Sequence, residues 1–333
     1  MADSLDPTDR RLLDGWQRAL PMVPRPFAAI AEATGLDEAE VIARLARMRD
    51  AGLLTRVGAT LRPNTAGAST LAAVAAPEHR IEEVARAIGA EPGVNHSYLR
   101  ENAWNLWFVV TGPERVAVDA ALARIGRATG LTVLDLPLVR PFNLDLGFPL
   151  SGGGRMAPAS AAPAGPIAIA AEDRAILQRL TEGLALVPRP YAALGAEIGL
   201  GEAQVLARLR RLTEGGVISR LGVILRHRAL GWTANAMVVW QLDDAEAAET
   251  GPRLAAQPGV TLCYQRRPAP GLWPYTLYAM IHARSREEAL ATLAAAEAGA
   301  GLAGRPREIL FSLRCFRQRG ATVAPGPARE AIP

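Results

Sequence analysis

The chain of 333 residues contains no lysine, so all 37 of its basic residues are arginine. This absence excludes Schiff-base chemistry and a lysine general base. Every cationic side chain other than histidine is a planar guanidinium, which binds carboxylates and phosphates through paired hydrogen bonds. The formal net charge of +4 is mild for this length and does not by itself indicate a nucleic-acid partner.

Cysteines and long apolar runs are also scarce. The two cysteines, Cys263 and Cys315, provide neither a disulfide framework nor zinc-ligand spacing, and they suit a reducing compartment. No apolar run reaches the roughly 20 residues of a membrane-spanning helix. The first residues are polar and acidic, unlike a secretory signal. We therefore expect a cytoplasmic protein without a membrane partner.

The most informative feature that is present is an internal duplication. Several segments recur with an offset of 164 residues early in each half and 166 residues later. The matching pairs are residues 23–29 with 187–193, 54–58 with 218–222, and 92–94 with 258–260. Two copies of one unit therefore lie in tandem. A site between them would have a pseudo-twofold shape but different residues on its two sides.

The first part of each copy has a helical pattern followed by short strands. Helices are predicted at residues 9–20, 27–34 and 37–50, and again at 172–184, 191–198 and 202–214. In the first copy, two short strands at 53–57 and 59–62 follow, and the second copy has strands around 218–226. Three helices with a two-stranded wing are typical of a winged helix-turn-helix.

The second part of each copy follows the order β-α-β-β-α-β. The predicted elements are 69–75, 81–88, 94–99, 105–111, 115–128 and 131–137, then 234–241, 245–256, 260–265, 276–283, 285–298 and 306–312. This order is that of a ferredoxin-like sheet with helices on one face. Two such sheets usually pack through their open faces or hold a ligand between them, which predicts an α+β fold and an intramolecular pseudo-dimer.

Composition sets the domain boundaries. Residues 151–171 and the residues after 320 are rich in Gly, Ala and Pro, as flexible segments are. We predict a winged helix-turn-helix at 1–66, a ferredoxin-like domain at 67–150, a flexible linker at 151–171, a second winged helix-turn-helix at 172–230, a second ferredoxin-like domain at 231–320 and a disordered tail at 321–333.

A helix-turn-helix first suggests a DNA-binding regulator. Its recognition helix would then need basic or amide side chains at the N-terminal end. The first copy has Asp37, Glu38 and Glu40 there, which repel phosphate, and the second has Glu202. The second copy also has Gly201 and Gln204 there, and its Arg208, Arg210 and Arg211 lie further along the helix. DNA binding is therefore disfavoured, although it stays open as an alternative.

A stronger concentration of functional side chains follows in the sheets. His96, Tyr98 and Arg100 alternate along one predicted strand and so share a face. The corresponding stretch of the second copy includes Tyr264 and Arg266. Aromatic, arginine and histidine side chains on one sheet face suit a flat, anionic ligand. In the alternative interpretation the aromatic residues form an interface core and Arg100 pairs with the neighbouring glutamate.

The predicted wing strands add further cations. These are Arg56, Arg62, Arg220, Arg226, His227 and Arg228. Such a patch is also typical of a solvated strand end, so its composition alone does not indicate a binding site. Of the other histidines, we expect His79 in a solvent-exposed loop and His282 in a structural role.

Together these motifs resemble the Lrp/AsnC-type siroheme decarboxylases. The resemblance rests on residues 56–58 with 62–65, on 95–98 with 105–108, on 226–228 with 235–240, and on 273–275 with 280–282. It covers about residues 5 to 317, and the first copy is similar to the D-type subunit and the second to the L-type. The resemblance implies two tandem Lrp/AsnC-like units, each with a winged helix-turn-helix and a ferredoxin-like βαββαβ domain.

The resemblance also implies a reaction. The acetate side chains at C12 and C18 of siroheme become methyl groups with loss of two CO2, giving 12,18-didecarboxysiroheme in haem d1 biosynthesis. It implies no separate cofactor, because the iron comes with the substrate. Partners would be siroheme and its decarboxylated products, with no nucleic acid, and a homodimer of the fused chain stays open. The alternatives are an Lrp/AsnC-type regulator and a tetrapyrrole-binding protein without catalysis.

On this hypothesis His96 and His227 act in acid–base catalysis or contact the iron. The carboxylate-binding arginines would be Arg56, Arg62, Arg100, Arg220, Arg226 and Arg266, and the ring pocket would be lined by Tyr98, Trp107, Tyr264 and Tyr278. The chain departs from the family at two places where histidine is common, namely Asn102 and Leu262. We therefore expect one functional pocket in each pseudo-dimer.

Overall fold

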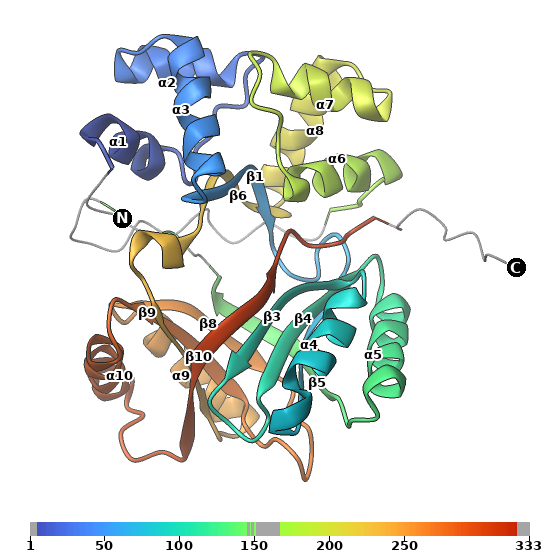
Figure 1. The fold of residues 1–333 in the computed structure, drawn as a ribbon, viewed down its shortest axis with the longest axis vertical. Coiled ribbons are helices and arrows are strands. Elements are labelled where there is room, and N and C mark those ends of the chain that lie inside the picture. Colours follow the sequence, from blue (N-terminus) through green and yellow to red (C-terminus); the bar gives the residue numbers. More distant parts are fainter. Residues whose placement is uncertain (1–4, 145–146, 148–149, 151–166, 325–333) are drawn as a thin grey trace, which may run out of the picture. The chain divides into compact units, whose positions relative to one another are not determined.

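The structure is a computed structural model that describes residues 5–144, 147, 150 and 167–324. It divides into two compact units, each of which takes a part from both copies. The helix-turn-helix unit contains residues 1–66 and 147–231, and the barrel unit contains residues 67–146 and 232–333 (Figure 1). The breaks at 66 and 231 agree within one residue with the predicted domain boundaries.

The helix-turn-helix unit contains the predicted helices of both copies, but the helix predicted at 9–20 ends at Gly15. Its elements are α1 (Pro7–Gly15), α2 (Pro26–Thr34), α3 (Glu38–Asp50), β1 (Leu54–Leu61), α6 (Ala171–Glu182), α7 (Pro190–Ile198), α8 (Glu202–Glu214), β6 (Ile218–Leu225) and the 3-10 turn η3 (His227–Leu230). The repeated Pro-Arg-Pro motif places a proline in the first turn of α2 and of α7, where its missing N–H is not needed. Arg25 and Arg189 of this motif pair with Glu38 and Glu202 at the start of the following helix.

The predicted two-stranded wings are wrong. β1 is one continuous strand, and it pairs in antiparallel fashion with β6 of the other copy, with Gly58 opposite Gly222. Neither glycine forms a turn. A Cβ at Gly58 would lie 2.2 Å from the carbonyl oxygen of Leu180, and one at Gly222 would lie 2.3 Å from that of Trp16. Glycine is therefore required because the helical segment of the other copy approaches the strand so closely.

The two copies are interleaved around this ribbon. Leu184 N–H of the second copy donates to Val57 O of the first at 2.7 Å, and Val223 N–H donates to Trp16 O at 2.8 Å. Within the unit, each copy thus satisfies backbone groups of the other. Because both copies lie in one chain, the first copy is always paired with the second.

The barrel unit confirms the β-α-β-β-α-β order in each copy. The first copy provides β2 (Ala68–Val74), α4 (Ile81–Ala90), β3 (Val94–Arg100), β4 (Leu106–Gly112), α5 (Arg115–Thr129) and β5 (Leu134–Asn143), with a 3-10 turn η2 (Glu78–Arg80) before α4. The second provides β7 (Ala234–Trp240), α9 (Asp244–Ala255), β8 (Val260–Arg266), β9 (Leu277–Ala283), α10 (Arg286–Ala300) and β10 (Arg307–Gln318).

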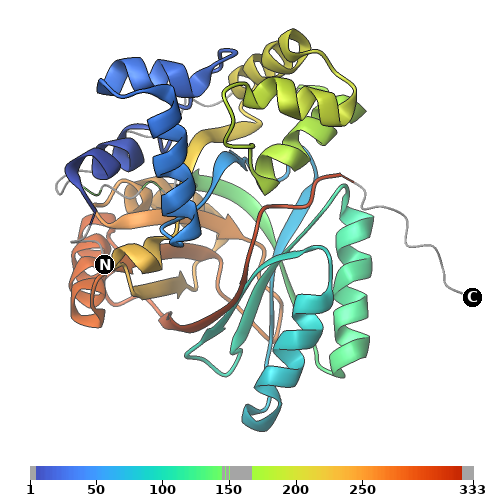
Figure 2. The same cartoon turned by 45° about the horizontal axis from the view of Figure 1, so that its top comes forward.

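The strands close into a barrel in the order β10-β3-β4-β2-β5-β8-β9-β7. Closure depends on the last strand of each copy, since β5 continues onto β8 and β10 continues onto β3. Each sheet thereby loses the free edges that would otherwise invite pairing with other chains. Helices α4 and α5 lie on the outer side of the strands (Figure 1 and Figure 2).

The apolar residues of the barrel unit form separate cores. One core lies between the strands and helices of the first copy, and another lies between those of the second. A third, in the barrel interior, draws on both copies and includes Leu71, Leu136, Met237, Val239 and Leu310. The interior is therefore packed by residues of both sheets.

Two predicted flexible segments differ in part from expectation. Residues 151–166 of the predicted linker lie outside the described residues, but α6 already begins at Ala171. The predicted disordered tail lies outside them from residue 325 onward. Before that point Thr322 N–H donates to Thr111 Oγ1 at 2.9 Å and Val323 is 5% exposed. The start of the tail therefore packs onto the barrel unit.

Candidate functional site

The inner side of β3 carries the predicted catalytic stretch. His96 and Tyr98 are stacked with ring centroids 6.5 Å apart, and the guanidinium carbon of Arg100 lies 5.5 Å from the Tyr98 ring centre. Arg100 is buried, and its Nη1 donates to Leu310 O of the second copy at 3.0 Å. The prediction that these three side chains share one face is therefore confirmed.

The second copy repeats this arrangement on β8. The guanidinium carbon of Arg266 lies 4.6 Å from the ring centre of Tyr264 and 5.9 Å from that of Tyr278. Arg266 Nη1 donates to Leu136 O of the first copy at 2.8 Å. At the position of His96, however, the second copy has Leu262, which packs against the barrel core. The two halves thus share the Tyr–Arg pair, and only the first adds an imidazole.

Both strands have an irregular register before these residues. The shift lies between Val94 and His96 in β3, and between Val260 and Leu262 in β8. Val94 and Val260 contribute to the outer, helix-facing cores. A bulge changes which residues face each side of a sheet, and here it lets Tyr98 and Tyr264 face the interior.

Trp107 and Tyr278 belong to the packed centre of the barrel. They are 1% and 0% exposed. Trp107 contacts Trp273 edge-on with ring centroids 5.0 Å apart, and Trp273 Nε1 donates to Tyr278 Oη at 2.8 Å. Burial raises the pKa of Tyr278, so its phenol is neutral. These predicted ring-pocket residues are therefore fixed by core packing.

Trp273 is a residue whose position in the barrel was not predicted. It follows the extra segment 268–272 of the second copy, and it is only 3% exposed within the barrel core. Ala269 N–H donates to Trp273 O, and Trp273 N–H donates to Ala269 O, at 2.9 and 2.8 Å. The insertion relative to the first copy was the only sequence signal, and it did not show which way the tryptophan points.

His282 has the structural role that we predicted. Its Nδ1 lies 2.8 Å from Thr261 Oγ1, and its Nε2 lies 2.9 Å from Asn235 Nδ2. Both ring nitrogens therefore have partners inside the barrel unit. His79 lies in the short turn η2 and is exposed, as expected.

Arg56 and Arg220 lie in the other unit, on the ribbon of β1 and β6. Arg56 Nη2 donates to Ala59 O at 3.2 Å, and burial lowers the pKa of Arg56 to about 10. Arg220 stands opposite Thr60 and is 7% exposed. The two guanidiniums occupy equivalent positions of the ribbon, as the duplication predicts.

Arg62 and Arg226 follow the ends of the same two strands. Arg62 Nε donates to Gly216 O, just beyond α8, at 3.2 Å. Arg226 Nη1 lies 3.6 Å from the position that a Cβ of Gly52 would take, just beyond α3. A cation at the C-terminal end of a helix is stabilised by the helix dipole. Both arginines therefore support the fold of this unit.

His227 lies in η3 of the helix-turn-helix unit and is 7% exposed. Burial, with a smaller contribution from Arg228, lowers the pKa of His227 to about 4. The imidazole is consequently neutral at pH 7, and it suits proton acceptance or metal contact better than proton donation. His96 and His227, predicted as a catalytic pair, lie in different units.

Most arginines of helices α3 and α8 are held by carboxylates within their own unit, whereas Arg210 donates to Met22 O at 2.9 Å. Arg44 Nη1 lies 2.9 Å from Asp9 Oδ1, and Arg208 Nη1 lies 2.9 Å from Asp173 Oδ1. Arg211 also pairs with Asp173, which is fully buried. These guanidiniums are thus engaged by buried acids of α1 and α6.

Within the ranges that the structure describes, no group of three or more His, Cys, Asp or Glu side chains is arranged to hold a metal ion. Within the same ranges, no helix is long and apolar enough to cross a membrane.

The sequence matches two protein-family profiles, each of them twice. The profile described as the AsnC-like ligand binding domain matches residues 66–143 and 229–317. The profile described as the siroheme decarboxylase NirDL-like HTH domain matches residues 9–54 and 173–218. Both matches follow the duplication.

Known proteins extend this likeness to the whole chain. The siroheme decarboxylase NirDL subunit of Paracoccus denitrificans is 59% identical over 321 residues, which covers 96% of this chain and 98% of that protein. The NirD subunit of Stutzerimonas stutzeri is 50% identical over 146 residues, which is 44% of this chain and 96% of that subunit. A crystal structure of the siroheme decarboxylase NirDL superposes with a TM-score of 0.68 at 24% identity, over 95% of this chain and 94% of the other. That similarity shows the fold, and the sequence identities show that this chain belongs to the NirDL family of siroheme decarboxylases.

Proposed function

We propose that this chain is a siroheme decarboxylase that removes CO2 from the C12 and C18 acetate groups of siroheme. The product is 12,18-didecarboxysiroheme, an intermediate of haem d1 biosynthesis. The observation that carries the proposal is the 59% identity to the Paracoccus denitrificans siroheme decarboxylase NirDL subunit over nearly the full length of both chains. A crystal structure of a NirDL protein with an iron-uroporphyrin III analogue also superposes, with a TM-score of 0.66.

The reaction has a simple balance. Each acetate loses CO2, the electron pair of the broken C–C bond is delocalised into the tetrapyrrole, and one proton converts the remaining carbon into a methyl group. No net oxidant or reductant is consumed, so the proposal includes no cofactor besides the iron that siroheme brings. The protein must hold the other carboxylates and deliver a proton, and a positioned general acid contributes typically 10²–10⁴-fold.

His96 is the proposed proton donor. It is the imidazole on the inner side of the barrel that stands next to a Tyr–Arg pair, and histidine is the commonest general acid among side chains. His227 is proposed to act as a neutral group, because its lowered pKa of about 4 leaves it unprotonated at neutral pH. The lowered pKa of His227 thus gives it a different proposed role from His96, although the sequence predicted one shared role for both.

Arg100 and Arg266 are the proposed carboxylate ligands in the barrel unit. A guanidinium has five N–H donors, and the bond to the carbonyl of Leu310 or Leu136 uses one of them. That bond fixes the guanidinium against the ring of Tyr98 or Tyr264. Preorganised donors of this kind orient a polycarboxylate without further loss of side-chain freedom. Arg56, Arg62, Arg220 and Arg226 stay predicted carboxylate ligands.

The proposal does not include nucleic acid as a partner. Glu38 and Glu202 lie at the start of α3 and α8 and pair there with Arg25 and Arg189, so the charges at these helix ends are balanced. Arg44 and Arg208 of these helices are engaged by Asp9 and Asp173. A gel-shift titration with mixed-sequence duplex DNA at moderate salt tests this part, and a specific complex would contradict it.

The main experiment is anaerobic incubation of the purified chain with siroheme, followed by absorbance and product mass. We expect loss of two CO2 per siroheme, and a slower reaction for His96→Ala. His79→Ala, which changes an exposed histidine, is the matched control and should react like the unmodified chain. An absorbance change without any change of substrate mass would show binding alone and would overturn the proposal.

A further inference from the structure

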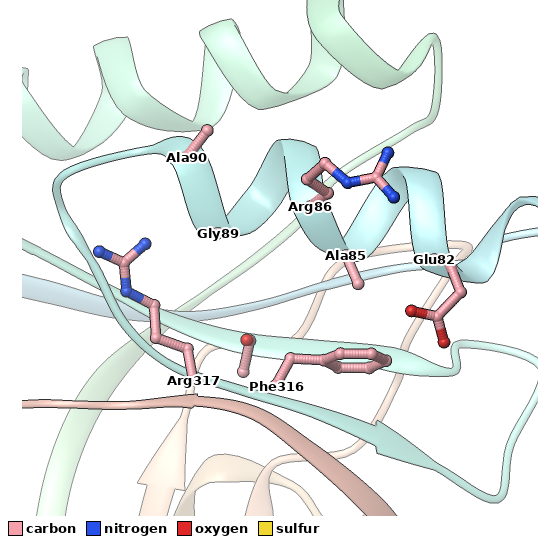
Figure 3. Close-up of a pocket in the computed structure, with 8 residues that line it drawn as sticks. Glu82, Ala85, Arg86, Gly89, Ala90, Phe316 and Arg317 are labelled. Carbon is pink, nitrogen blue, oxygen red and sulfur yellow. The ribbon is translucent and has the colours of Figure 1, made fainter.

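A pocket of about 510 Å³ lies on the outer side of the barrel unit, where α4 crosses β3 and the end of β10 (Figure 3). Its walls come from both copies, since Glu82 and Arg86 project from α4 while Phe316 and Arg317 reach it from β10. Ser97 also lines it, and Ser97 alternates on β3 with the inward-facing His96. The pocket is therefore on the opposite side of β3 from the barrel interior.

The equivalent place in the second copy is filled by an aromatic ring. The strand registers establish the equivalence, because Arg317 stands opposite Ser97 in one half and Asn143 stands opposite Cys263 in the other. A Cβ at Gly251 of α9 would lie 2.1 Å from the ring of Phe142. The Phe142 ring thus occupies the space that the missing side chain leaves.

In the first copy an alanine prevents the same closure. Ala85 of α4 corresponds to Gly251, and Phe316 corresponds to Phe142. The methyl group of Ala85 takes up the volume into which the Phe316 ring would have to move. Phe316 packs instead beside the core of the first copy, and the pocket stays open.

The charged residues of the pocket also have no counterpart in the second copy. Arg86 corresponds to Pro252, and Arg317 corresponds to Asn143. Within the described part of the chain, the guanidiniums of Arg86 and Arg317 form no hydrogen bond or ion pair. Asn143, in contrast, donates through Nδ2 to the backbone of β8. Two cations therefore line an open pocket in one half alone, Arg317 near Gly89 and Arg86 toward the Glu82 end of α4 (Figure 3).

The remaining polar groups favour a ligand that accepts hydrogen bonds. The carboxylate of Glu82 is already held by Arg314. Ser97 is 3% exposed, and its Oγ has no hydrogen-bond partner among the described residues. The corresponding Cys263 directs its Sγ to Gly251 O at 3.5 Å. A buried hydroxyl without a partner is unfavourable, and an acceptor bound in the pocket would satisfy it.

We propose that this pocket binds a small organic carboxylate, separately from siroheme. The carboxylate group pairs with the guanidinium of Arg317 and accepts a hydrogen bond from the Ser97 hydroxyl, and Arg86 adds positive charge at the other end of the pocket. The apolar part of the ligand lies against the Phe316 ring. Arginine provides the planar donors that a carboxylate prefers, and the aromatic wall selects an organic anion over an inorganic one.

The test uses 4-fluorobenzoate and the full chain, with binding followed by ¹⁹F NMR of the probe. We expect saturable broadening and a shift of the probe signal. 4-Fluorobenzyl alcohol, which lacks the carboxylate, should bind at least about tenfold more weakly than 4-fluorobenzoate. Inorganic phosphate, which lacks the ring, should also bind at least about tenfold more weakly, as measured by its competition with the probe. Absence of saturable 4-fluorobenzoate binding would overturn the proposal.

Variants locate the binding. Arg317→Asn introduces the residue of the second copy and should weaken 4-fluorobenzoate binding by about tenfold or more. The separate variant Arg86→Ala should weaken binding to a similar extent. Arg253→Ala removes an exposed arginine of α9 that pairs with Glu249, and it should leave binding unchanged. Equal affinity of Arg317→Asn, Arg86→Ala and the unmodified chain would place the probe elsewhere and contradict the proposal.

A further variant tests the pocket without changing a charge. Ala85→Gly creates the space that Gly251 provides in the second copy, so the Phe316 ring should move in and close the pocket. Affinity for 4-fluorobenzoate should then fall, even though a side chain has become smaller. Thermal unfolding of the same samples shows whether each variant is folded. Undiminished binding by folded Ala85→Gly would contradict the role given to Ala85 and Phe316.

Discussion

The two halves of the barrel differ in the side chains on their inner faces, although their strands have the same order and register. Each half has a tyrosine followed by an arginine that bonds to a carbonyl of the other copy. In the second half, Leu262 stands where the first has His96, and the adjacent insertion buries Trp273. Tyr264 is buried, whereas Tyr98 is partly exposed. One half therefore has the Tyr–Arg pair alone, and the other has this pair beside His96, the proposed proton donor.

The largest expected effect comes from removing the proposed proton donor. His96→Ala should slow CO2 release from siroheme by about 10²–10⁴-fold, which is the usual contribution of a general acid. Single-turnover product masses under anaerobic conditions measure it. Leu262→Ala is the matched change in the other half and should have a much smaller effect. Equal losses in the two variants would show that the halves do not differ in chemistry.

The second comparison concerns the ends of β1 and β6, where His227 of the second copy corresponds to Pro63 of the first. The pKa of His227 falls from an ordinary 6.5 to about 4 in the folded protein, mainly because of burial. Between these values the unfolded chain binds more protons, so stability decreases as the pH falls from about 6.5 to about 4. The contribution is on the order of 3 kcal/mol.

Urea unfolding at several pH values checks this prediction. In His227→Gln, the decrease of stability between pH 6.5 and pH 4 should be smaller by that amount, while the other titrating groups stay the same. His79→Gln changes an exposed histidine and serves as the control. If His227→Gln and the unmodified chain had parallel stability profiles, His227 would not be neutral and buried in the folded state.

The positions of helices and the faces of strands could largely be predicted from one copy of the sequence. Prolines 26 and 190 mark the first turns of α2 and α7, because a proline fits there without losing a hydrogen bond. Alternation along residues 96–100 placed the imidazole, the phenol and the guanidinium on one face, as the ring contacts confirm. These are local properties, which depend on neighbours in the chain.

What could not be predicted depends on the other copy. The strand predicted at 131–137 is observed as Leu134–Asn143 because its second half pairs with β8. Similarly, the strand predicted at 306–312 is Arg307–Gln318, which continues onto β3. The strands predicted at 53–57 and 59–62 were divided at Gly58, since a glycine that ends a strand and one needed for close approach look the same in a sequence. Partner-dependent pairing leaves no periodic signal in either partner.

The third prediction tests the symmetry of the ribbon in the helix-turn-helix unit. Gly58→Ala and Gly222→Ala should each lower the free energy of unfolding by about 1–3 kcal/mol, since the new Cβ would overlap a backbone carbonyl that belongs to the other copy. Urea unfolding measures both. Gly15→Ala, at the end of α1 with no atom within 4 Å of the new Cβ, should be neutral or slightly stabilising. A destabilised Gly58→Ala beside an unchanged Gly222→Ala would show that only one copy makes the close contact.

The smallest expected effect concerns the arginines that the two barrel halves share. Arg100→Gln and Arg266→Gln each keep a donor for the carbonyl of Leu310 or Leu136, but remove the positive charge. Because a spectator carboxylate is bound equally in the ground state and the transition state, each variant should raise KM for siroheme about tenfold and leave kcat nearly unchanged. Steady-state kinetics under anaerobic conditions separate the two parameters. A similar rise in both variants means that both halves grip the macrocycle, whereas a fall of kcat in Arg100→Gln alone would place the guanidinium of the first half in the chemical step beside His96.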